Sequence, residues 1–365
     1  MLNHKTIAVV VPCYNEETQI GMVIETMPDF VDRIVIVNDN SKDKTAAVVE
    51  NYIGQLQPSA IIEDATQKEF SANRYNKAEE VLHLQSIEEK KLFNPSVVAN
   101  KTPSTDRIIL INHTVNGGVG AAIASGYKWC KDHKIDCTAV MAGDGQMDPS
   151  ELEGICMPVV SEQVDYVKGN RLIHRSAWLV IPKVRFFGNS ILSILTKLAS
   201  GYWRISDTQT GYTAISLAGL NAIRLYDIYK SYGMPNDMLV KLNIAMCTLR
   251  EVEIKPVYNV GEASKMKIFK VIPRVSWLLV KLFFNRLWNK YLFRDFHPLF
   301  ILYHLGFLLM LFSIPYGVKI CGRIIEGATV NPVTLLGFGF LILTGIQFLL
   351  FAMWMDIQDN ERLYK

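Results

Sequence analysis

Residues 9–17 read VVVPCYNEE, and this stretch decides how the chain is expected to fold. An apolar, β-branched run that is followed at once by proline and polar side chains is typical of a buried strand ending at the edge of a sheet. Residues 37–45 (VNDNSKDKT) have the same pattern, and residues 142–149 (AGDGQMDP) follow another apolar run. We therefore predict several buried strands whose ends carry acidic and amide groups.

The segments between these strands have helical spacing. Strand-like runs such as Ile7–Val11 and Arg33–Val37 alternate with helix-like segments such as Val119–His133. Strands that alternate with helices of 10–15 residues predict βαβ units, so we expect an α/β, Rossmann-like domain over residues 1–264, with a mostly parallel sheet and helices on both faces. Residues 58–105 are polar, rich in Lys and Glu, and interrupt this rhythm. We interpret them as an inserted helical excursion or mobile flap.

The C-terminal part of the chain has the composition of a membrane anchor. The mean hydropathy of +0.16 is high for a wholly soluble enzyme. Its source is two stretches without a charged residue, 23 residues over 296–318 and 29 residues over 327–355. Each exceeds the roughly 20 apolar residues that cross a bilayer. We predict transmembrane helices at about 297–318 and 334–355, within a C-terminal region that spans 296–365 and ends in a short tail.

Residues 265–295 separate the two regions. They hold eight Lys or Arg and no acid before Asp295, interleaved with aromatic and aliphatic side chains. Such a segment predicts basic amphipathic helices in the membrane interface, beginning near Pro273 and attracted to anionic lipids. The alternative partner, nucleic acid, is disfavoured by the adjacent spans and by a net charge of only +3. The positive-inside rule then places the catalytic domain and both termini in the cytosol, with residues 319–333 outside.

The strand ends supply the residues that could carry chemistry. In parallel α/β sheets, ligands bind beyond the carboxyl ends of the strands. The side chains expected there are Asn15, Glu16, Asp39, Asp144 and Gln146. Asp144 with Gln146 suits a hard divalent cation, Mg²⁺ or Mn²⁺, that bridges a diphosphate. A single such Asp could equally cap a turn, but three motifs at successive strand ends favour a binding site.

These motifs resemble the nucleotide-sugar domain of family 2 glycosyltransferases, which has the GT-A fold, and most resemble the group of dolichol-phosphate mannose synthases and bacterial polyprenyl-phosphate hexosyltransferases. The resemblance covers about residues 6–265 apart from the insertion. It implies that Asp144 and Gln146 hold Mg²⁺ or Mn²⁺ against the sugar-nucleotide diphosphate. The residues that it implies for the nucleoside are Pro12, Tyr14, Asn15, Glu16 and Asp39. Two carboxylates usual in the family are replaced, by Asn38 and by Ala142.

Further matches lie downstream. Arg171 of GNR, Arg185 and Asn189 resemble the residues that hold the acceptor phosphate, and two guanidinium groups suit that anion, although each Arg could instead form a surface salt bridge. Residues 207–212 (DTQTGY) resemble a segment near the sugar and include Asp207. Two further matches are the glycine loop 116–120, which contains Gly118, and the pair Ser264 and Lys265, which resembles a motif that meets the diphosphate. Close helix packing would explain the glycines equally well.

The resemblance implies inverting transfer of one hexose or hexosamine from a UDP- or GDP-sugar to a polyprenyl phosphate. The acceptor is already an anion, so catalysis would consist of positioning and of charge neutralisation by the metal and by Lys265. The residues expected to act in catalysis are Asp144, Arg171, Arg185, Asp207 and Lys265.

Two other functions stay open from the sequence. Transfer to a hydroxyl of a lipid-linked glycan or glycolipid would need a general base, for which Asp237 is the candidate, although Asp237 also suits the start of a helix. A membrane scaffold could bind a nucleotide-sugar without turnover. Homo-oligomers are also possible, because Gly337, Gly339 and Gly345 in the second span permit close helix packing.

Overall fold

The computed structural model describes residues 1–55, 73–257 and 268–365. The described residues form one eight-stranded sheet with the order β3-β4-β2-β1-β5-β7-β6-β8. Strands β4, β2, β1 and β5 run parallel, as do β6 and β8, whereas β3 and β7 pair antiparallel with their neighbours. The strands are β1 (Ile7–Cys13), β2 (Arg33–Asn38), β3 (Ser96–Val98), β4 (Ile108–His113), β5 (Cys137–Val140), β6 (Tyr166–Asn170), β7 (Thr213–Ser216) and β8 (Leu249–Glu253). The predicted α/β class is confirmed.

Helices cover both faces of this sheet. Successive side chains of β1 alternate between two cores, as the twofold period of a strand requires. Val10 packs in the core that α4 covers, and Val9 packs in the core that α1 and α5 cover. The helices are α1 (Ile20–Glu25), α2 (Thr45–Tyr52), α3 (Lys77–Lys90), α4 (Val119–Asp132), α5 (Leu152–Glu162), α6 (Ala177–Val180), α7 (Lys183–Ser200), α8 (Leu217–Ala222), α9 (Met234–Ile244), α10 (Ile268–Trp288), α11 (Pro298–Ile325) and α12 (Pro332–Asn360).

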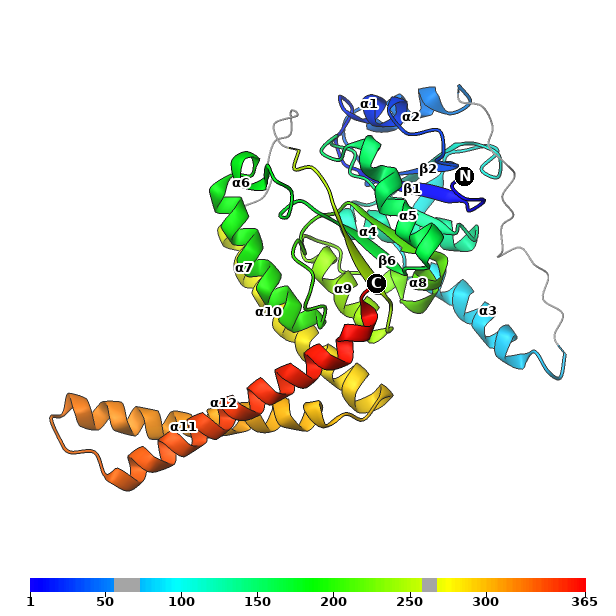
Figure 1. The fold of residues 1–365 in the computed structure, drawn as a ribbon. Helices are drawn as coiled ribbons and strands as arrows, with labels where there is room; N and C mark the ends of the chain where they lie inside the picture. The colour runs from blue at the N-terminus through cyan, green and yellow to red at the C-terminus, as the bar shows by residue number, and fades with distance from the viewer. Residues whose placement is uncertain (56–72, 258–267) are drawn as a thin grey trace.

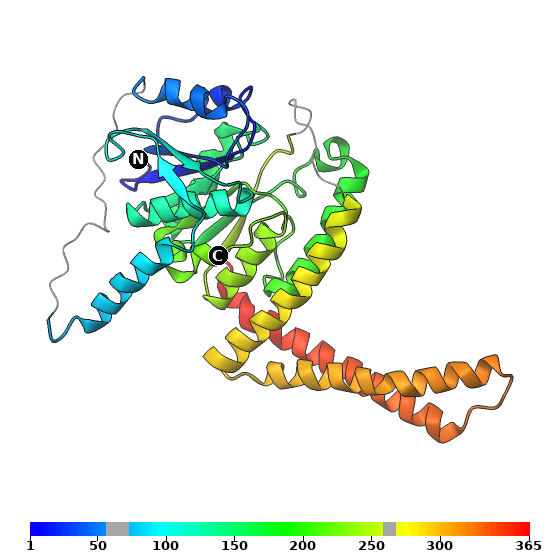
Figure 2. The ribbon, with the colours of Figure 1, turned by 180° about the vertical axis from the view of Figure 1, so that it is seen from behind.

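The insertion is only partly the excursion that the sequence predicts. Helix α3 has no buried residue and projects away from the sheet (Figures 1 and 2). The segment after α3, however, returns to the body, and β3 extends the sheet by pairing Ser96 with His113 at the edge of β4. The description of the whole insertion as an excursion or flap is therefore wrong for residues 96–98, which belong to the sheet.

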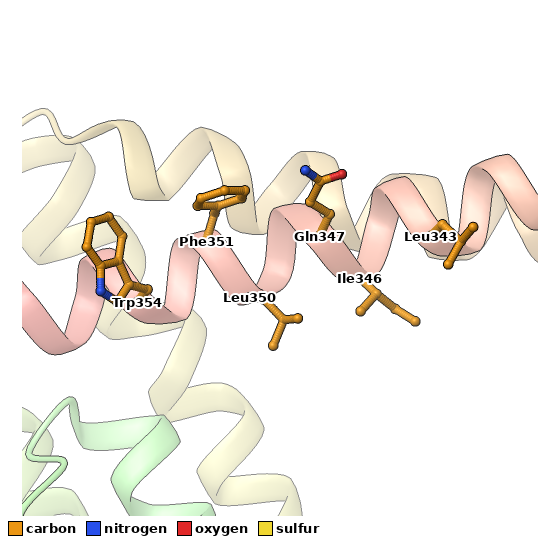
Figure 3. A pocket seen from close by; sticks show the side chains of 6 residues that line it. All are labelled: Leu343, Ile346, Gln347, Leu350, Phe351 and Trp354. Carbon is orange, nitrogen blue, oxygen red and sulfur yellow. The ribbon is translucent and has the colours of Figure 1, made fainter.

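The C-terminal part is a pair of long apolar helices that extends away from the sheet (Figure 1). Within the residues that the structure describes, two helical stretches are long and apolar enough to cross a membrane, Pro298–Ile325 and Pro332–Leu363. Small residues bring α11 and α12 together, because a Cβ on Gly345 would lie 3.3 Å from the carbonyl oxygen of Gly306. Gly345 thus serves packing within the chain. A hollow on the outer side of α12 is lined by apolar side chains and Gln347 (Figure 3).

Helix α10 lies beside α7 (Figure 1) and already includes Pro273 in its interior, so the prediction that Pro273 marks its start is wrong. Part of its apolar face packs on the protein and not on lipid: Val275 and Leu279 are buried in a cluster with Ala199 of α7. Trp277 on another side of the helix stays 73% exposed. Only that exposed side is available to a membrane interface.

A buried charge cluster, here called the joint quartet, connects the helix pair to the α/β domain. It consists of Arg286, Lys290, Asp356 and Asp359. Arg286 donates two hydrogen bonds of 2.7 Å to the Asp356 carboxylate, and both side chains are fully buried. Arg286 also donates to the carbonyl oxygen of Ala199 in α7, and the Lys290 ammonium lies 3.3 Å from Asp359. The end of α12 is thus held against α7 and α10.

Candidate active site

The loops that follow β1 and β2 brace each other at the carboxyl edge of the sheet. The backbone N–H of Asn15 donates to Ser41 Oγ at 3.0 Å, and that of Glu16 donates to Thr45 Oγ1 at 3.0 Å. The side-chain oxygen of Asn15 in turn accepts from the N–H of Lys42 at 2.8 Å. Helix α1 begins only at Ile20, because the backbone before it is committed to this brace. Asn15 has a structural role whatever it contacts in a ligand.

Asp39 lies beside this brace and is nearly buried, at 3% exposed. Its carboxylate accepts from the N–H groups of Gly117 and Gly118 at 2.8 and 2.7 Å, and Oδ1 lies 2.7 Å from His113 Nδ1. These partners come from residues 74 or more positions away. In the described geometry Asp39 organises the glycine loop, and a nucleoside could reach its carboxylate only if that loop moved.

The glycines of the loop have packing reasons of their own. Gly118 has a φ of +84°, and a Cβ there would lie 2.4 Å from the carbonyl oxygen of Lys230. A Cβ on Gly120 would lie 2.1 Å from the carbonyl oxygen of Tyr229. The close packing considered from the sequence therefore explains both residues. A contact of Gly118 with the donor stays a prediction.

A cavity of about 200 Å³ opens at the ends of β5 and β6. The predicted Asp144, Gln146 and Arg171 all line it, together with the turn at residues 209–212. The sequence analysis missed three further wall residues, Asp148, Glu151 and Lys255. Lys255 Nζ lies 3.3 Å from the Asp148 carboxylate, and the Lys255 N–H donates to Glu151 at 2.8 Å. The Asp-Pro pair at 148–149 is a visible signal, but it equally marks the start of a helical turn.

Carboxylates converge between β1 and the cavity. The Asp144 carboxylate accepts from the N–H of Gln146 at 3.1 Å, in a turn that Gly145 permits with a φ of +74°. Burial raises the pKa of the Cys13 thiol at the end of β1, and the negative charges of Glu16, Asp144 and Asp43 raise it further. The carboxylates of Glu16, Asp43 and Asp144, which follow β1, β2 and β5, therefore lie near Cys13 at this edge of the sheet.

The donor set suits a divalent cation that arrives with a phosphate ligand. In the described ranges, no group of three or more His, Cys, Asp or Glu side chains could hold a metal alone. Asp144 and Gln146 nevertheless offer the oxygen donors that Mg²⁺ and Mn²⁺ prefer, and both line the cavity. A cation held there would take its remaining ligands from a diphosphate and water. The residues fit that arrangement.

Asp207 holds Arg171 at the cavity wall. Arg171 Nε donates to Oδ2 of Asp207 at 2.8 Å and Nη2 donates to Oδ1 at 3.1 Å. Burial alone would raise the pKa of Asp207, but the charge and hydrogen bonds of Arg171 outweigh it and hold that pKa below its usual range. Asp207 is 0% exposed and does not line the cavity, whereas the Arg171 side chain is 22% exposed. Asp207 therefore contacts Arg171 and is not among the residues that line the cavity, and a catalytic role for it stays a prediction.

The remaining predicted residues lie elsewhere. Arg185 and Asn189 are both on α7, and Asn189 is absent from the described cavity wall. Ser264 and Lys265 lie outside the described residues. The Asp237 carboxylate is only 5% exposed, because it accepts from Lys241 Nζ at 2.6 Å and from the N–H of Tyr229 at 2.9 Å. Asp237 is therefore committed to α9 and to the chain before it.

The sheet and this cavity agree with what the chain is similar to. The model of glycosyl transferase family 2 matches residues 8–81 and 95–224, more than half of the chain. The chain belongs to glycosyltransferase family 2. The gap in the match coincides with the end of α3 and the segment before β3. Family 2 membership and the mixed sheet together confirm the predicted GT-A fold and make the chain a glycosyltransferase.

Two curated relatives of this family 2 chain are lipid-phosphate sugar transferases by name. The UDP-N-acetylglucosamine–dolichyl-phosphate N-acetylglucosaminyltransferase of Methanococcus voltae is 26% identical, over 75% of this chain and 96% of that one. The dolichyl-phosphate beta-glucosyltransferase of Trichomonas vaginalis is 24% identical, over 79% and 76%. A structure of glucosyl-3-phosphoglycerate synthase from Mycobacterium tuberculosis, in complex with Mn²⁺, UDP and glucosyl-3-phosphoglycerate, matches with a TM-score of 0.46 at 14% identity, over 78% and 80%.

Proposed function

We propose that the protein transfers one sugar, with inversion, from a UDP- or GDP-sugar to a polyprenyl phosphate at the cytosolic face of a membrane. One observation carries this proposal: Asp144, Gln146 and Arg171 line a single cavity. Asp144 and Gln146 can hold a cation against a diphosphate, and Arg171 can present a guanidinium to a second phosphate. The names of the two relatives support the same acceptor class.

The chemistry needs little from the protein beyond position and charge. A polyprenyl phosphate is an anionic nucleophile at neutral pH, so the chain need not remove a proton from it. Asp207 fixes the Arg171 guanidinium so that it can orient the phosphate oxygen towards the sugar, which converts an encounter into an aligned attack. Asp144 and Gln146 would hold Mg²⁺ or Mn²⁺, which neutralises the charge that develops on the leaving diphosphate.

The surroundings of Asp237 favour a phosphate acceptor over a hydroxyl acceptor. A general base must come within hydrogen-bond reach of the proton that it removes. Asp237 is bound to Lys241 and Tyr229 and does not line the cavity. A non-catalytic scaffold has no supporting observation among the described residues.

The exposed apolar surface supports a place at the membrane. Figure 2 shows α7 and α10 side by side, with α10 leading towards the α11–α12 pair. Helices α6, α7 and α10 carry large apolar side chains that are exposed. They include Trp178, Leu179, Phe187, Ile191, Ile194 and Trp277. Aromatic and aliphatic groups beside a basic segment suit the headgroup region of a bilayer. In the proposed arrangement α11 and α12 cross the membrane and the cavity faces the headgroups.

The test is transfer by the full chain in liposomes with radiolabelled donors. UDP-N-acetylglucosamine comes first because a relative is named for it, followed by UDP-glucose and GDP-mannose. We expect label on polyprenyl phosphate, released by mild acid as a glycosyl phosphate requires, and none on the neutral polyprenol. Label only on a hydroxyl acceptor, or transfer from none of the donors, would contradict the proposal.

A further inference from the structure

Lys168 occupies an unexpected place in the sheet. It lies in the middle of β6 and is 0% exposed, although Lys is almost never fully buried without a partner. Its Nζ donates to the carbonyl oxygen of Thr210 at 2.5 Å. Thr210 lines the cavity, in the turn that begins at Asp207. Through this hydrogen bond the Lys168 ammonium holds the backbone of the cavity wall.

Two carboxylates and two cations meet beneath this wall, and we call Lys168, Arg171, Asp207 and Glu251 the cavity quartet. Arg171 pairs directly with Asp207. The Glu251 carboxylate instead accepts from the N–H groups of Ser206 and Asp207 at 2.8 and 3.1 Å. Asn170 Nδ2 donates to its other oxygen at 2.8 Å. These donors to Glu251 are neutral, so its charge is balanced through space and not by contact.

Lys168 supplies that balance. Burial lowers the pKa of Lys168 to about 8, while the charges of Asp207 and Glu251 oppose the decrease and the charge of Arg171 adds to it. Burial likewise raises the pKa of Glu251, and this rise is opposed by the hydrogen bonds from Ser206, Asp207 and Asn170 and also by the Lys168 charge. Without Lys168, two buried carboxylates would share the single cation Arg171. Glu251 would then compete for the guanidinium or take up a proton, and the turn at 206–210 would lose a hydrogen-bond donor.

We propose that Lys168 is a positioning residue of the sugar-transfer site, whose buried ammonium holds the turn at 207–210 and keeps Arg171 aligned on Asp207 at the cavity wall. This proposal rests on the proposed function for its kinetic test. It concerns a residue that contacts neither the donor nor the acceptor. Lys168 is required in its charged form, which exists below pH 8 and is lost as the pH rises through that value.

The first test is Lys168→Met, which keeps the length of the side chain and removes the charge. We expect kcat to fall about 100-fold at neutral pH, because a small misplacement of the wall misaligns the reacting groups. In wild type, kcat should decline as the pH passes 8, and the variant should lack this step. Lys290→Met is the matched control, because Lys290 is also buried, with a pKa lowered by burial to about 8, but belongs to the joint quartet. In this control variant, kcat should still decline as the pH passes 8.

A second variant, in which the buried charges are balanced, distinguishes misplaced charge from misfolding. Lys168→Met with Glu251→Gln removes one charge of each sign, so we expect it to recover about tenfold of the lost kcat. A Lys168→Met protein within twofold of wild type, or one whose loss Glu251→Gln does not relieve, would overturn the proposal. The structure of Lys168→Met tests the proposal independently of activity. An unmoved turn and an intact Arg171–Asp207 pair in that structure would overturn the proposal about Lys168. Absence of sugar transfer by wild type would instead overturn the proposed function.

A different observation, on α12, carries a second inference. The exposed side chains of this helix include a stripe spaced four and three residues apart, Leu336, Phe340, Leu343, Gln347, Leu350 and Trp354, with Leu335, Ile346 and Phe351 exposed beside it. Figure 3 shows the hollow along it, with the amide of Gln347 among apolar groups. Gln347 makes no side-chain hydrogen bond within the described part of the chain. It lies eight residues, about 12 Å along the helix, from the end of the uncharged stretch, too far for its amide to reach water.

The Gln347 amide indicates which kind of partner binds this stripe. Polar groups at bilayer depth pair with other polar groups, because lipid offers no donor or acceptor. An isoprenoid chain in the hollow would leave Gln347 unpaired for the same reason. A second copy of this chain, related by a twofold axis, places Gln347 opposite Gln347, and each amide can both donate and accept. A single polar residue in an apolar stripe also fixes the register of a helix pair.

We infer that the Gln347 stripe of α12 is the contact between two copies of this chain in the membrane. This inference rests on the proposed membrane placement, which flotation and resistance to carbonate extraction test separately. Energy transfer between labelled full chains in liposomes measures dimerisation. Gln347→Leu should raise the dissociation constant about 5- to 30-fold, and Gln347→Asn should raise it less. Phe312→Leu, on an exposed face of α11, is the matched control.

Oxidative cross-linking provides a second measurement of the same contact. In a Cys321→Ser background, which removes the exposed native thiol, Leu343→Cys should form dimers and Leu311→Cys on α11 should not. A monomer at every protein-to-lipid ratio, equal cross-linking at both positions, or unchanged dimerisation in Gln347→Leu would overturn the inference.

Discussion

The cavity quartet and the joint quartet have the same composition, two cations and two carboxylates, and differ in how they are closed. In the joint, Arg286 and Asp356 are both fully buried, and neutral partners such as Tyr291 complete their hydrogen bonds. In the cavity quartet, the Arg171 side chain remains 22% exposed and forms part of the cavity wall. An ion pair that the protein encloses completely serves architecture, whereas a guanidinium that lines a cavity can contribute to binding an anion.

The difference also separates what each cluster positions. Lys168 and Glu251 of the cavity quartet lie within β6 and β8, Arg171 follows β6, and the quartet holds part of the cavity wall. The joint quartet holds the end of α12 against α7 and α10, and therefore sets where the helix pair leaves the domain. We expect damage to the first to appear in the chemistry and damage to the second to appear in stability and in the use of membrane-bound acceptors.

The largest effect is expected at Asp144. Asp144→Asn removes the carboxylate that would hold the cation, so transfer should fall about 1,000-fold while thermal unfolding stays unchanged. Asp148→Asn is the matched control, because Asp148 lines the same cavity but pairs with Lys255. Activity of Asp144→Asn near the wild-type level would place the reaction elsewhere.

Arg286→Met should lower stability and leave the chemistry of transfer largely unchanged. Removing one partner of a fully buried ion pair leaves Asp356 uncompensated, and such a loss costs about 3–5 kcal/mol of stability. Thermal unfolding in detergent measures this effect. Arg323→Met, an exposed residue of α11, should change stability by less than about 0.5 kcal/mol. Equal unfolding temperatures for the two variants would show that the joint contributes nothing.

The loss of Arg171 should appear in the chemistry, with a smaller effect on turnover than the loss of Asp144. Arg171→Met should lower kcat/KM for the lipid phosphate about 100-fold and leave the affinity for UDP within about threefold. Arg171→Lys should not restore transfer, because an ammonium cannot reproduce the two parallel bonds to Asp207. Full rescue by Lys would contradict the positioning role of Asp207.

The smallest effect is expected at Asp237. Asp237→Asn should leave transfer to polyprenyl phosphate within about twofold, because no proton needs to be removed from that acceptor. A modest decrease in stability is expected from the loss of the Lys241 ion pair. A large loss of kcat at unchanged stability would instead support a hydroxyl acceptor with Asp237 as base.

The strands were predictable because their signals are local. β1 and β2 are continuous β-branched runs, and each is buried on both faces. β3 was not predictable, because a strand of three exposed residues exists only through its pairing with β4. The start of α10 before Pro273 likewise has no local signal, since a proline within a helix depends on its surroundings.

Within the site, the motif residues Asp144, Gln146 and Arg171 were predicted to act together, and the structure brings them to one cavity. The commitment of Asp39 to His113 and the glycine loop was not predictable, because those partners are distant in the chain. Lys168 gives no signal at all in the sequence: a lysine within a strand ordinarily faces solvent, and only the positions of Asp207 and Glu251 explain its burial.

The most direct measurement compares both clusters in one assay, sugar transfer by the full chain to a short-chain polyprenyl phosphate in detergent and to a long-chain one in liposomes. Wild type should be active in both. Arg171→Met should lose about 100-fold in both, whereas Arg286→Met should keep transfer within about threefold in detergent and lose it in liposomes. Equal loss for the two variants in detergent, or no transfer by wild type to either lipid phosphate, would contradict a division of roles in which the cavity carries out transfer and the joint quartet positions the cavity at the membrane.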